Sequence, residues 1–469
     1  MLSKNTLAFA SVLLLSACAV TRVDPPAPAT APVAFKENGL WQHGAVATTA
    51  PIPDAWWTLF KDPVLDDLQQ RLVIGNENLK ASVAQVASAR ATLAASRTAV
   101  FPTLSAGLAG TRSANPQTSS TNATSNGSPS NSLSLSTTAS WELDLWGRLA
   151  IASSGAQASL QASANDLASA TLSAQALLAQ TYFSLRAAEA QQALYARSVA
   201  AFQRSLDLTQ VRYQAGVAAR SDVLQAQTQL KSAQAQALES VAQRAQLEHA
   251  IAVLLGQPPS SFSIARNEQL PLPPAVPELL PASLLERRPD IAAAKARVTA
   301  AYAQIGIADA AFFPSLTLSA SSGYRNSSLA NLVSAPNLFW SLGPSLAASI
   351  FDGGQRKLAS AQARNSANVA TSTYRQAVLT ALQEVEDNLV LADQLQQEAQ
   401  LQAEASESAQ RALEITLDQY RAGTVGFLNV AAAQSAALNS EISLLSVRNR
   451  QLAAVNQLLK NIAGRWGAV

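Results

Sequence analysis

Hydrophobic residues repeat along this chain of 469 residues with two different periods. Long stretches rich in alanine, glutamine and leucine, with almost no proline, place apolar residues at steps of three and four, which predicts helices. Shorter stretches alternate apolar and polar residues, which predicts strands with one apolar and one polar face. The pattern therefore predicts a mainly α-helical chain that also carries a small set of amphipathic strands.

The longest predicted helices cover about 148–213 and 355–420, some 65 residues each, or roughly 100 Å at 1.5 Å per residue. The first of them carries an apolar seam at alternating steps of three and four. The seam residues are Leu178, Thr181, Leu185, Ala188, Gln192, Tyr195, Val199, Phe202, Leu206, Thr209 and Tyr213. Such a seam, in a helix much longer than 25 residues, is typical of a coiled coil.

A glycine and then a second helix follow each long helix. Gly216 and Gly423 end the long helices, since glycine readily adopts the positive φ of a helix terminus. The return helices are predicted over about 220–255 and 427–463. Each half of the chain therefore contains a helical hairpin whose tip reads Y-x-A-G.

The alternating segments lie at 103–112, 132–145, 315–325 and 338–350. In 132–145, leucine and tryptophan fall on one face and serine falls on the other. Alternation over about ten residues is typical of a membrane strand with a lipid face and a lumen face, and a half-buried strand of a soluble protein has the same pattern. The polar segments 113–131 and 326–337 predict solvated loops between the strands.

The two halves of the chain look like copies of one another. The pairs that recur in the same order are Phe101-Pro102 and Phe313-Pro314, Asp144 and Asp352, Arg148 and Arg356, and Tyr213 and Tyr420. Ordered repetition of this kind predicts two structurally equivalent units. Each unit begins with an alanine-rich helix, at 64–99 in the first half and at 281–311 in the second.

The N-terminal residues predict export. Lys4, an apolar stretch at 5–17 and small residues before Cys18 form a secretory signal that is too short to span a membrane as a helix. The tetrapeptide ending at Cys18 resembles a bacterial lipobox, in which the signal is cut before a cysteine that then carries lipid. The alternative is an ordinary signal peptide that is removed together with its cysteine.

These features divide the chain into five predicted segments. They are a signal peptide at 1–17, a lipidated N-terminal segment at 18–61, a first repeat at 62–256, a proline-rich connector at 257–280 and a second repeat at 281–469.

Charge is sparse and balanced along the chain. Only 14% of residues are charged and the formal net charge is +2, so no strong field attracts nucleic acid. After residue 17 no apolar run is long enough for a spanning helix, so a membrane-spanning form of this chain must use its strands. Bacterial membrane barrels have at least eight strands. Two chains would give a filled barrel, whereas three would give twelve strands and a water-filled lumen, which favours three chains for a pore.

Several segments together resemble the TolC family of outer-membrane channels, in particular its OprM-like lipoprotein branch. The matching segments are the lipobox at Cys18, W-W-T-L-F-K-D-P-V-L-D-D-L at 56–68, L-L-E-R-R-P-D-I-A-A-A-K-A-R at 284–297, A-Q-I-G-I-A-D-A-A-F-F-P-S-L at 303–316, F-D-G-G-Q-R at 351–356 and the two Y-x-A-G tips. The resemblance implies a homotrimer with a twelve-stranded β-barrel in the outer membrane, four strands per chain, and a periplasmic tunnel of α-helical hairpins. It also implies an equatorial region in the periplasm, which here would include the N-terminal segment 18–61 and the connector 257–280.

The resemblance also implies the function and the partners. The chain would be the outer-membrane channel of a tripartite efflux pump that passively exports small molecules such as drugs. Its partners would be a periplasmic adaptor protein, an RND-type inner-membrane pump and the outer-membrane lipid that holds the acylated Cys18. No cofactor is implied.

In this family the hairpin tips meet the hairpin of the adaptor. The resemblance assigns this contact to Tyr213, Gly216, Val217, Tyr420, Gly423 and Thr424. The plainer interpretation is that each glycine only reverses the chain. Both roles are compatible.

The resemblance further implies a periplasmic gate at the tips, closed by polar links between neighbouring helices. The residues at or beside the matching positions are Arg220, Asp222, Arg421 and Asn429. Asp222 lies where the family has one partner of a charge link, but Val425 and Asn429 replace residues that are charged in some members. Pairing of Arg220 or Arg421 with Asp222 would be worth only about 0–1 kcal/mol, which suits a gate that opens. A helix cap is the plainer role for Asp222.

Two other classes of function compete with a channel. An enzyme is disfavoured, because His43 and His249 lie far apart and the chain has no nucleophile, phosphate-loop or dinucleotide motif. A lipid-anchored coiled-coil scaffold explains the helices but not the four strands at matching places. An outer-membrane duct for type I secretion is an alternative within the channel class.

Overall fold

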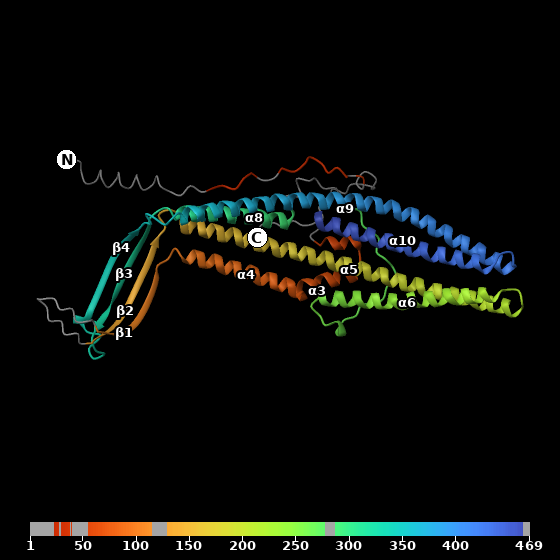
Figure 1. Ribbon diagram of the computed structural model, residues 1–469, viewed down its shortest axis with the longest axis horizontal. Coiled ribbons are helices and arrows are strands. Elements are labelled where there is room, and N and C mark those ends of the chain that lie inside the picture. The colour runs from red at the N-terminus through yellow and green to blue at the C-terminus, as the bar shows by residue number, and fades with distance from the viewer. Residues whose placement is uncertain are drawn as a thin grey trace. The chain divides into compact units, whose positions relative to one another are not determined.

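The computed structural model describes residues 23–27, 30–37, 39, 55–114, 129–276 and 287–462. The predicted signal peptide, the predicted lipidation site Cys18 and His43 lie outside these residues. The described chain divides into two compact units, and each unit takes segments from both halves of the sequence. One unit contains the strands and the other contains the tips of the helical hairpins, with the elements labelled as in Figure 1.

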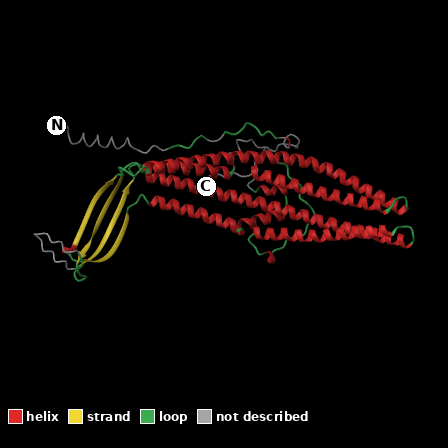
Figure 2. Ribbon diagram, viewed as in Figure 1, coloured by secondary structure: helices red, strands yellow, loops and turns green. Residues whose placement is uncertain are grey.

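Four antiparallel strands, yellow in Figure 2 and labelled in Figure 1, form one sheet in the order β1-β2-β3-β4. They are β1 (Thr103–Ser113), β2 (Ser130–Leu143), β3 (Ser315–Asn326) and β4 (Leu338–Ala347). Two strands end earlier than predicted, at 143 instead of 145 and at 347 instead of 350. The chain leaves β2 at Asp144 because this carboxylate accepts a hydrogen bond from Ala150 N (2.9 Å) and so begins the next helix.

The strand register separates the two kinds of side chain. Leu135 lies opposite Leu108 on β1 and Tyr324 on β3, and the leucine and tryptophan residues of all four strands share this face. The opposite face consists mostly of serine, threonine, glycine and alanine. On it, the hydroxyls of Ser321 and Ser341 lie 2.8 Å apart. The alternation predicted for each strand therefore adds up to one apolar and one polar face of the whole sheet.

Trp146 connects the two repeats where the sheet meets the helices. Its ring stacks on Phe313 with 5.1 Å between the ring centroids, and its Nε1 donates a hydrogen bond to Pro314 O (2.5 Å). The recurring Phe-Pro motif of the second repeat thus holds the chain just before α5 (Arg148–Gln214) begins.

The recurring Asp and Arg residues have different partners in the two repeats. Arg356 Nε donates to Asp352 at 2.6 Å. Arg148 instead binds Glu142 through Nη2, with distances of 2.8 and 2.9 Å to the two carboxylate oxygens. The sequence duplication therefore predicts the positions of these groups but not their ion pairs.

The long helices form two hairpins. The first consists of α5 and α6 (Arg220–Leu254), and the second of α9 (Gln355–Ala422) and α10 (Phe427–Ile462). Every boundary lies within two residues of the predicted one. Most of the predicted seam of α5 is buried, but Tyr213 at its end is exposed. Across the described ranges, none of the helices is apolar over enough of its length to cross a membrane.

The predicted helix at 64–99 is two helices, α3 (Pro63–Gly75) and α4 (Glu77–Thr98). Asn76 causes the break, since its Nδ2 donates to Leu254 O (2.7 Å) and its Oδ1 accepts from Leu79 N (3.0 Å). A short 3-10 helix, η1 (Trp56–Phe60), precedes α3. The counterpart in the second repeat is α8 (Pro289–Ala310), which has proline in its first turn. Residues 281–286 of the helix predicted at 281–311 lie outside the described residues.

A buried charge network holds the connector between the repeats. Glu189 on α5 accepts hydrogen bonds from Arg186 Nη1 (2.7 Å) and Arg244 Nε (3.0 Å), and all three side chains are buried. The two arginines also donate to the carbonyls of Ala265 and Ile264, both at 2.8 Å. The connector is therefore fixed to α5 and α6 by charge-assisted hydrogen bonds that no sequence pattern predicts.

Candidate functional site at the hairpin tips

Both hairpins reverse direction through the same backbone structure. Gly216 has a φ of 77° and Gly423 a φ of 80°. Next to them, Val217 N donates to Arg212 O (2.9 Å) and Thr424 N donates to Gln419 O (3.0 Å). These bonds satisfy carbonyls at the helix ends in a Schellman arrangement. The predicted role of both glycines in chain reversal is confirmed.

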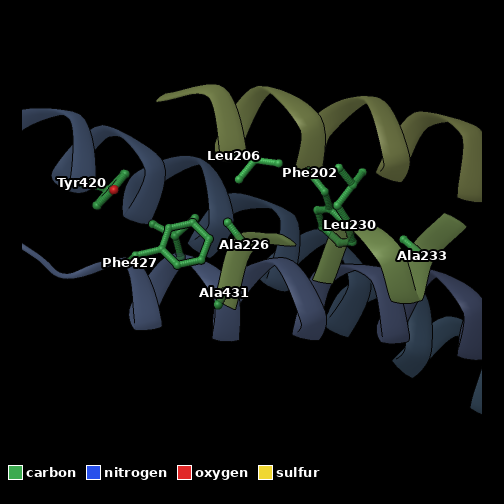
Figure 3. Packing of buried hydrophobic residues seen from close by; sticks show 9 residues of the cluster. Phe202, Leu206, Ala226, Leu230, Ala233, Tyr420, Phe427 and Ala431 are labelled. Carbon is green, nitrogen blue, oxygen red and sulfur yellow. The ribbon is translucent and has the colours of Figure 1, made fainter. Parts of the chain in front are cut away.

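The two hairpins pack against each other below their tips. One cluster of buried side chains takes members from all four helices (Figure 3). The members are Phe202, Leu206, Ala226, Leu230, Ala233, Tyr420, Phe427, Val430 and Ala431. Val425 is partly buried against this cluster. The tips therefore share one apolar core.

Polar groups also connect the hairpins inside this region. Gln434 Nε2 on α10 donates to Ser205 Oγ on α5 at 2.7 Å, and both side chains are buried. Gln229 Nε2 on α6 donates to Ala431 O at 2.9 Å and to Ser435 Oγ at 3.1 Å. Directional bonds of this kind fix how the two hairpins are placed along each other.

The equivalent tip tyrosines have different environments. Tyr213 is 44% exposed, whereas Tyr420 is 3% exposed. The Tyr420 ring meets Phe427 edge to face with 5.8 Å between the centroids, and its hydroxyl donates to Thr209 Oγ1 at 3.2 Å. Tyr213 is therefore available to a partner, while Tyr420 supports the second tip from within.

Arg212 spans the two tips. Its guanidinium carbon lies 4.6 Å from the centre of the Tyr420 ring, and Nη1 donates to Tyr420 O at 2.5 Å. Its Nη2 lies 3.6 Å from the point that a Cβ at Gly423 would occupy. Sequence reasoning missed this residue, although Gln419 at the equivalent place in the second half marks a difference between the repeats.

The four predicted gate residues are exposed or partly exposed at the tips. Arg421 pairs with Asp418 (2.8 Å) and not with Asp222, so the suggested Arg421–Asp222 pair is wrong within one chain. Arg220 lies two positions from Asp222 on α6, a spacing that points the side chains apart, and Asp222 makes no ion pair with any described residue.

Asp222 does not cap its helix either. The N-cap of α6 is Ala219, and no side chain accepts a capping hydrogen bond there. Asp222 instead lies in the first turn, where its negative charge interacts favourably with the helix dipole. Asn429 is exposed in the first turn of α10. The gate residues thus face outward from a single chain.

The described residues contain no group of three or more histidine, cysteine, aspartate or glutamate side chains placed to hold a metal ion.

The two halves of the chain also match a known family. The sequence model described as outer membrane efflux protein matches residues 68–257 and 280–464. The chain belongs to the outer membrane efflux protein family. It is an outer-membrane channel for efflux with a large periplasmic part, and the predicted resemblance to TolC-type channels is confirmed. The matched proteins are transport channels and not enzymes.

Relatives and solved structures of this family cover nearly the whole chain. The pyoverdine export outer membrane protein OpmQ of Pseudomonas aeruginosa is 32% identical over 469 residues, which is 99% of this chain and 97% of OpmQ. The solvent efflux pump outer membrane protein SrpC of Pseudomonas putida is 30% identical over 97% of each chain.

Two structures of outer-membrane channels have the same fold. That of OprN gives a TM-score of 0.88 at 27% identity, over 95% of this chain and 99% of OprN. The open state of MtrE from Neisseria gonorrhoeae gives a TM-score of 0.82 at 26% identity, over 95% and 98% of the two chains.

Proposed function

We propose that three copies of this chain form a passive duct through which a tripartite pump exports small molecules across the outer membrane. The observation that carries this proposal is the sheet, in which four strands place leucine and tryptophan on one face and hydroxyl groups on the other. Strands β1 and β4 each have only one neighbour within the described chain. Unpaired strand edges in lipid cost several kcal/mol per group, so neighbouring copies pair these edges. Three copies supply twelve strands, enough for an open lumen.

The cargo is a class of small molecules and not one compound. OpmQ is named for pyoverdine export and SrpC for solvent efflux, so relatives of similar identity are named for different cargo. The same type of duct thus carries different molecules, and the inner-membrane pump selects which of them enter it. Nothing in the fold favours the secretion of whole proteins, and the membership of the channel family disfavours the scaffold.

The hairpin tips are the contact surface for the periplasmic adaptor. Val217 is 66% exposed and lies beside the half-exposed Tyr213 at the first tip. Gly216, Gly423 and Thr424 give the two tips their shared backbone form. Tyr420 would not touch the adaptor, because its ring is buried; it supports the second tip from within. An adaptor hairpin would therefore contact exposed side chains at the first tip and the shared backbone turn at both tips.

The gate lies between copies of the chain. Arg220, Asp222, Arg421 and Asn429 are exposed or partly exposed in one chain, so they can contact the neighbouring copy or the adaptor, Arg421 by exchanging its exposed partner Asp418. Contacts of this kind between exposed charges are each worth about 0–1 kcal/mol, so an adaptor can displace them. The predicted lipid on Cys18 would anchor the complex without taking part in transport.

Native mass spectrometry of the complex, extracted in mild detergent after signal processing, tests this function. We expect a trimer whose chains each start at Cys18 and carry acyl groups, and which conducts ions in a planar bilayer. A folded monomer without conductance would overturn the shared barrel. A conducting trimer of chains without acyl groups would retain the duct and refute only the lipidation of Cys18.

A further inference from the structure

The polar face of the sheet carries very little charge. In the described strands its only charged side chains are Glu142 on β2 and Arg325 on β3. Glu142 is neutralised by Arg148, which binds both of its carboxylate oxygens. Arg325 lies opposite Ser134, eight residues away from Glu142 along β2. That distance is about 27 Å at 3.4 Å per residue, more than twice the screening length of salt water, so Glu142 does not offset Arg325.

No acidic residue lies near Arg325 in the sequence either. Residues 103–141 and 315–351, which include both loops between the strands, contain no aspartate or glutamate. Their only charged residues are Arg112 and Arg325. The end of the sheet remote from the helices is therefore purely cationic. Neither Arg112 nor Arg325 forms an ion pair with any described residue.

An aromatic ring holds the Arg325 side chain on the polar face. The guanidinium carbon lies 5.2 Å from the centre of the Phe339 ring on β4. Stacking of this kind occupies one flat side of the guanidinium and leaves the N–H groups at its edge free to bind an acceptor. Arg325 therefore presents oriented donors and a fixed positive charge to whatever passes along the hydroxyl-lined face.

We propose that Arg325 lines the outer part of the duct and makes it favour anions, so that anionic small molecules leave more readily than cationic ones of equal size. The inference rests on the proposed trimeric duct, in which three copies of Arg325 form one ring. Rings of arginine select anions in pores because the lumen concentrates their field. Carboxylates and other oxyanions suit the guanidinium edge best, since its N–H groups match their geometry.

Arg112 provides a matched control. It lies opposite Asn131, in register with Leu133 and Leu135, and therefore on the apolar face of the sheet. Replacing it removes the same charge from the same sheet but from the side that faces away from the lumen. An effect of charge on folding or on the membrane surface would appear in both variants, whereas an effect on passing ions would appear in one.

The experiment measures the reversal potential of the purified trimer in a planar bilayer under a KCl gradient. We expect R325Q to lower the chloride-to-potassium permeability ratio about twofold and R325E to lower it further, as a screened ring of three charges dictates. R325K should keep the wild-type ratio, because it keeps the charge, and R112Q should change it little.

Two failures are distinguishable. Channels that conduct normally with the same permeability ratio in wild type, R325Q and R325E would overturn the role of Arg325 and leave the duct intact. A wild-type protein that forms no channel at all would overturn the duct itself, and the anion preference with it. An equal change in R112Q and R325Q would also refute the proposal, because the charge would then act from outside the lumen.

Discussion

Removal of the Arg212 side-chain charge should loosen the contact between the two hairpin tips of a chain. Arg212 on α5 both donates to Tyr420 O and stacks on the Tyr420 ring at the end of α9. The substitution Arg212→Met keeps the apolar stem of the side chain and deletes both interactions. Because the two tyrosine contacts join one hairpin to the other, the change acts on their separation and not on either helix alone.

The structure sets the size of the effect. A hydrogen bond from a charged donor contributes about 1.5–3 kcal/mol, and a cation–π contact at a partly exposed site contributes about 0.5–1 kcal/mol. Arg212 is only half-buried, so water replaces part of both contributions when the contact breaks. The net loss is about 1–2 kcal/mol per chain, which makes separation of the tips about 5- to 30-fold more favourable.

Single-channel recording in planar bilayers measures this effect. We expect Arg212→Met channels to spend more time in high-conductance states than wild-type channels. Arg204→Met is the control, since Arg204 lies on the same helix, is exposed and pairs with no described residue. If Arg212→Met and Arg204→Met both conduct like the wild type, the Arg212–Tyr420 contact does not restrain the tips.

Three further predictions concern the unit that contains the hairpin tips. Glu189→Gln should destabilise the protein by about 3–5 kcal/mol, seen as a lower midpoint in urea, because it leaves the buried Arg186 without its counter-charge and leaves Arg244 paired with Glu248 alone; an unchanged midpoint would contradict this. Gly423→Ala should lower the affinity for the adaptor, because a Cβ costs about 1–2 kcal/mol at the positive φ of this residue. Gly426→Ala should leave the affinity unchanged, because Gly426 has an ordinary φ and open space around it. Burial alone would raise the pKa of Asp290. The hydrogen bond and the positive charge of the Arg288 guanidinium have the larger effect, so the pKa of Asp290 lies below its usual range. This carboxylate therefore stabilises the fold above its unfolded pKa of about 3.9 and loses that effect as the pH falls through its lower folded pKa. Arg288→Met should accordingly flatten the fall in melting temperature as the pH drops below about 4, and an equally steep fall in the variant would refute this role.

Local pattern was enough to predict the elements. The heptad seam of α5, the alternation in the strands and the glycines at both tips act through neighbours a few residues away, so the sequence carries their signal directly. The break at Asn76 escaped prediction for the opposite reason. Its side chain is held by Leu254 O, 178 residues along the chain, and no local pattern contains that contact.

The sequence by itself determined the duplication, the two hairpins, the two faces of each strand and the positions of the tips. Only the tertiary structure decided which of two equivalent residues is buried and which partner each one binds. Tyr213 and Tyr420 carry the same local signal, yet hairpin packing exposes the first and buries the second. Arg212 gains its partner because α5 and α9 end side by side, and Arg148 and Arg356 differ because only one has Glu142 beside it. Burial and pairing depend on neighbours that are distant in sequence, and a duplicated sequence repeats its local pattern without repeating its surroundings.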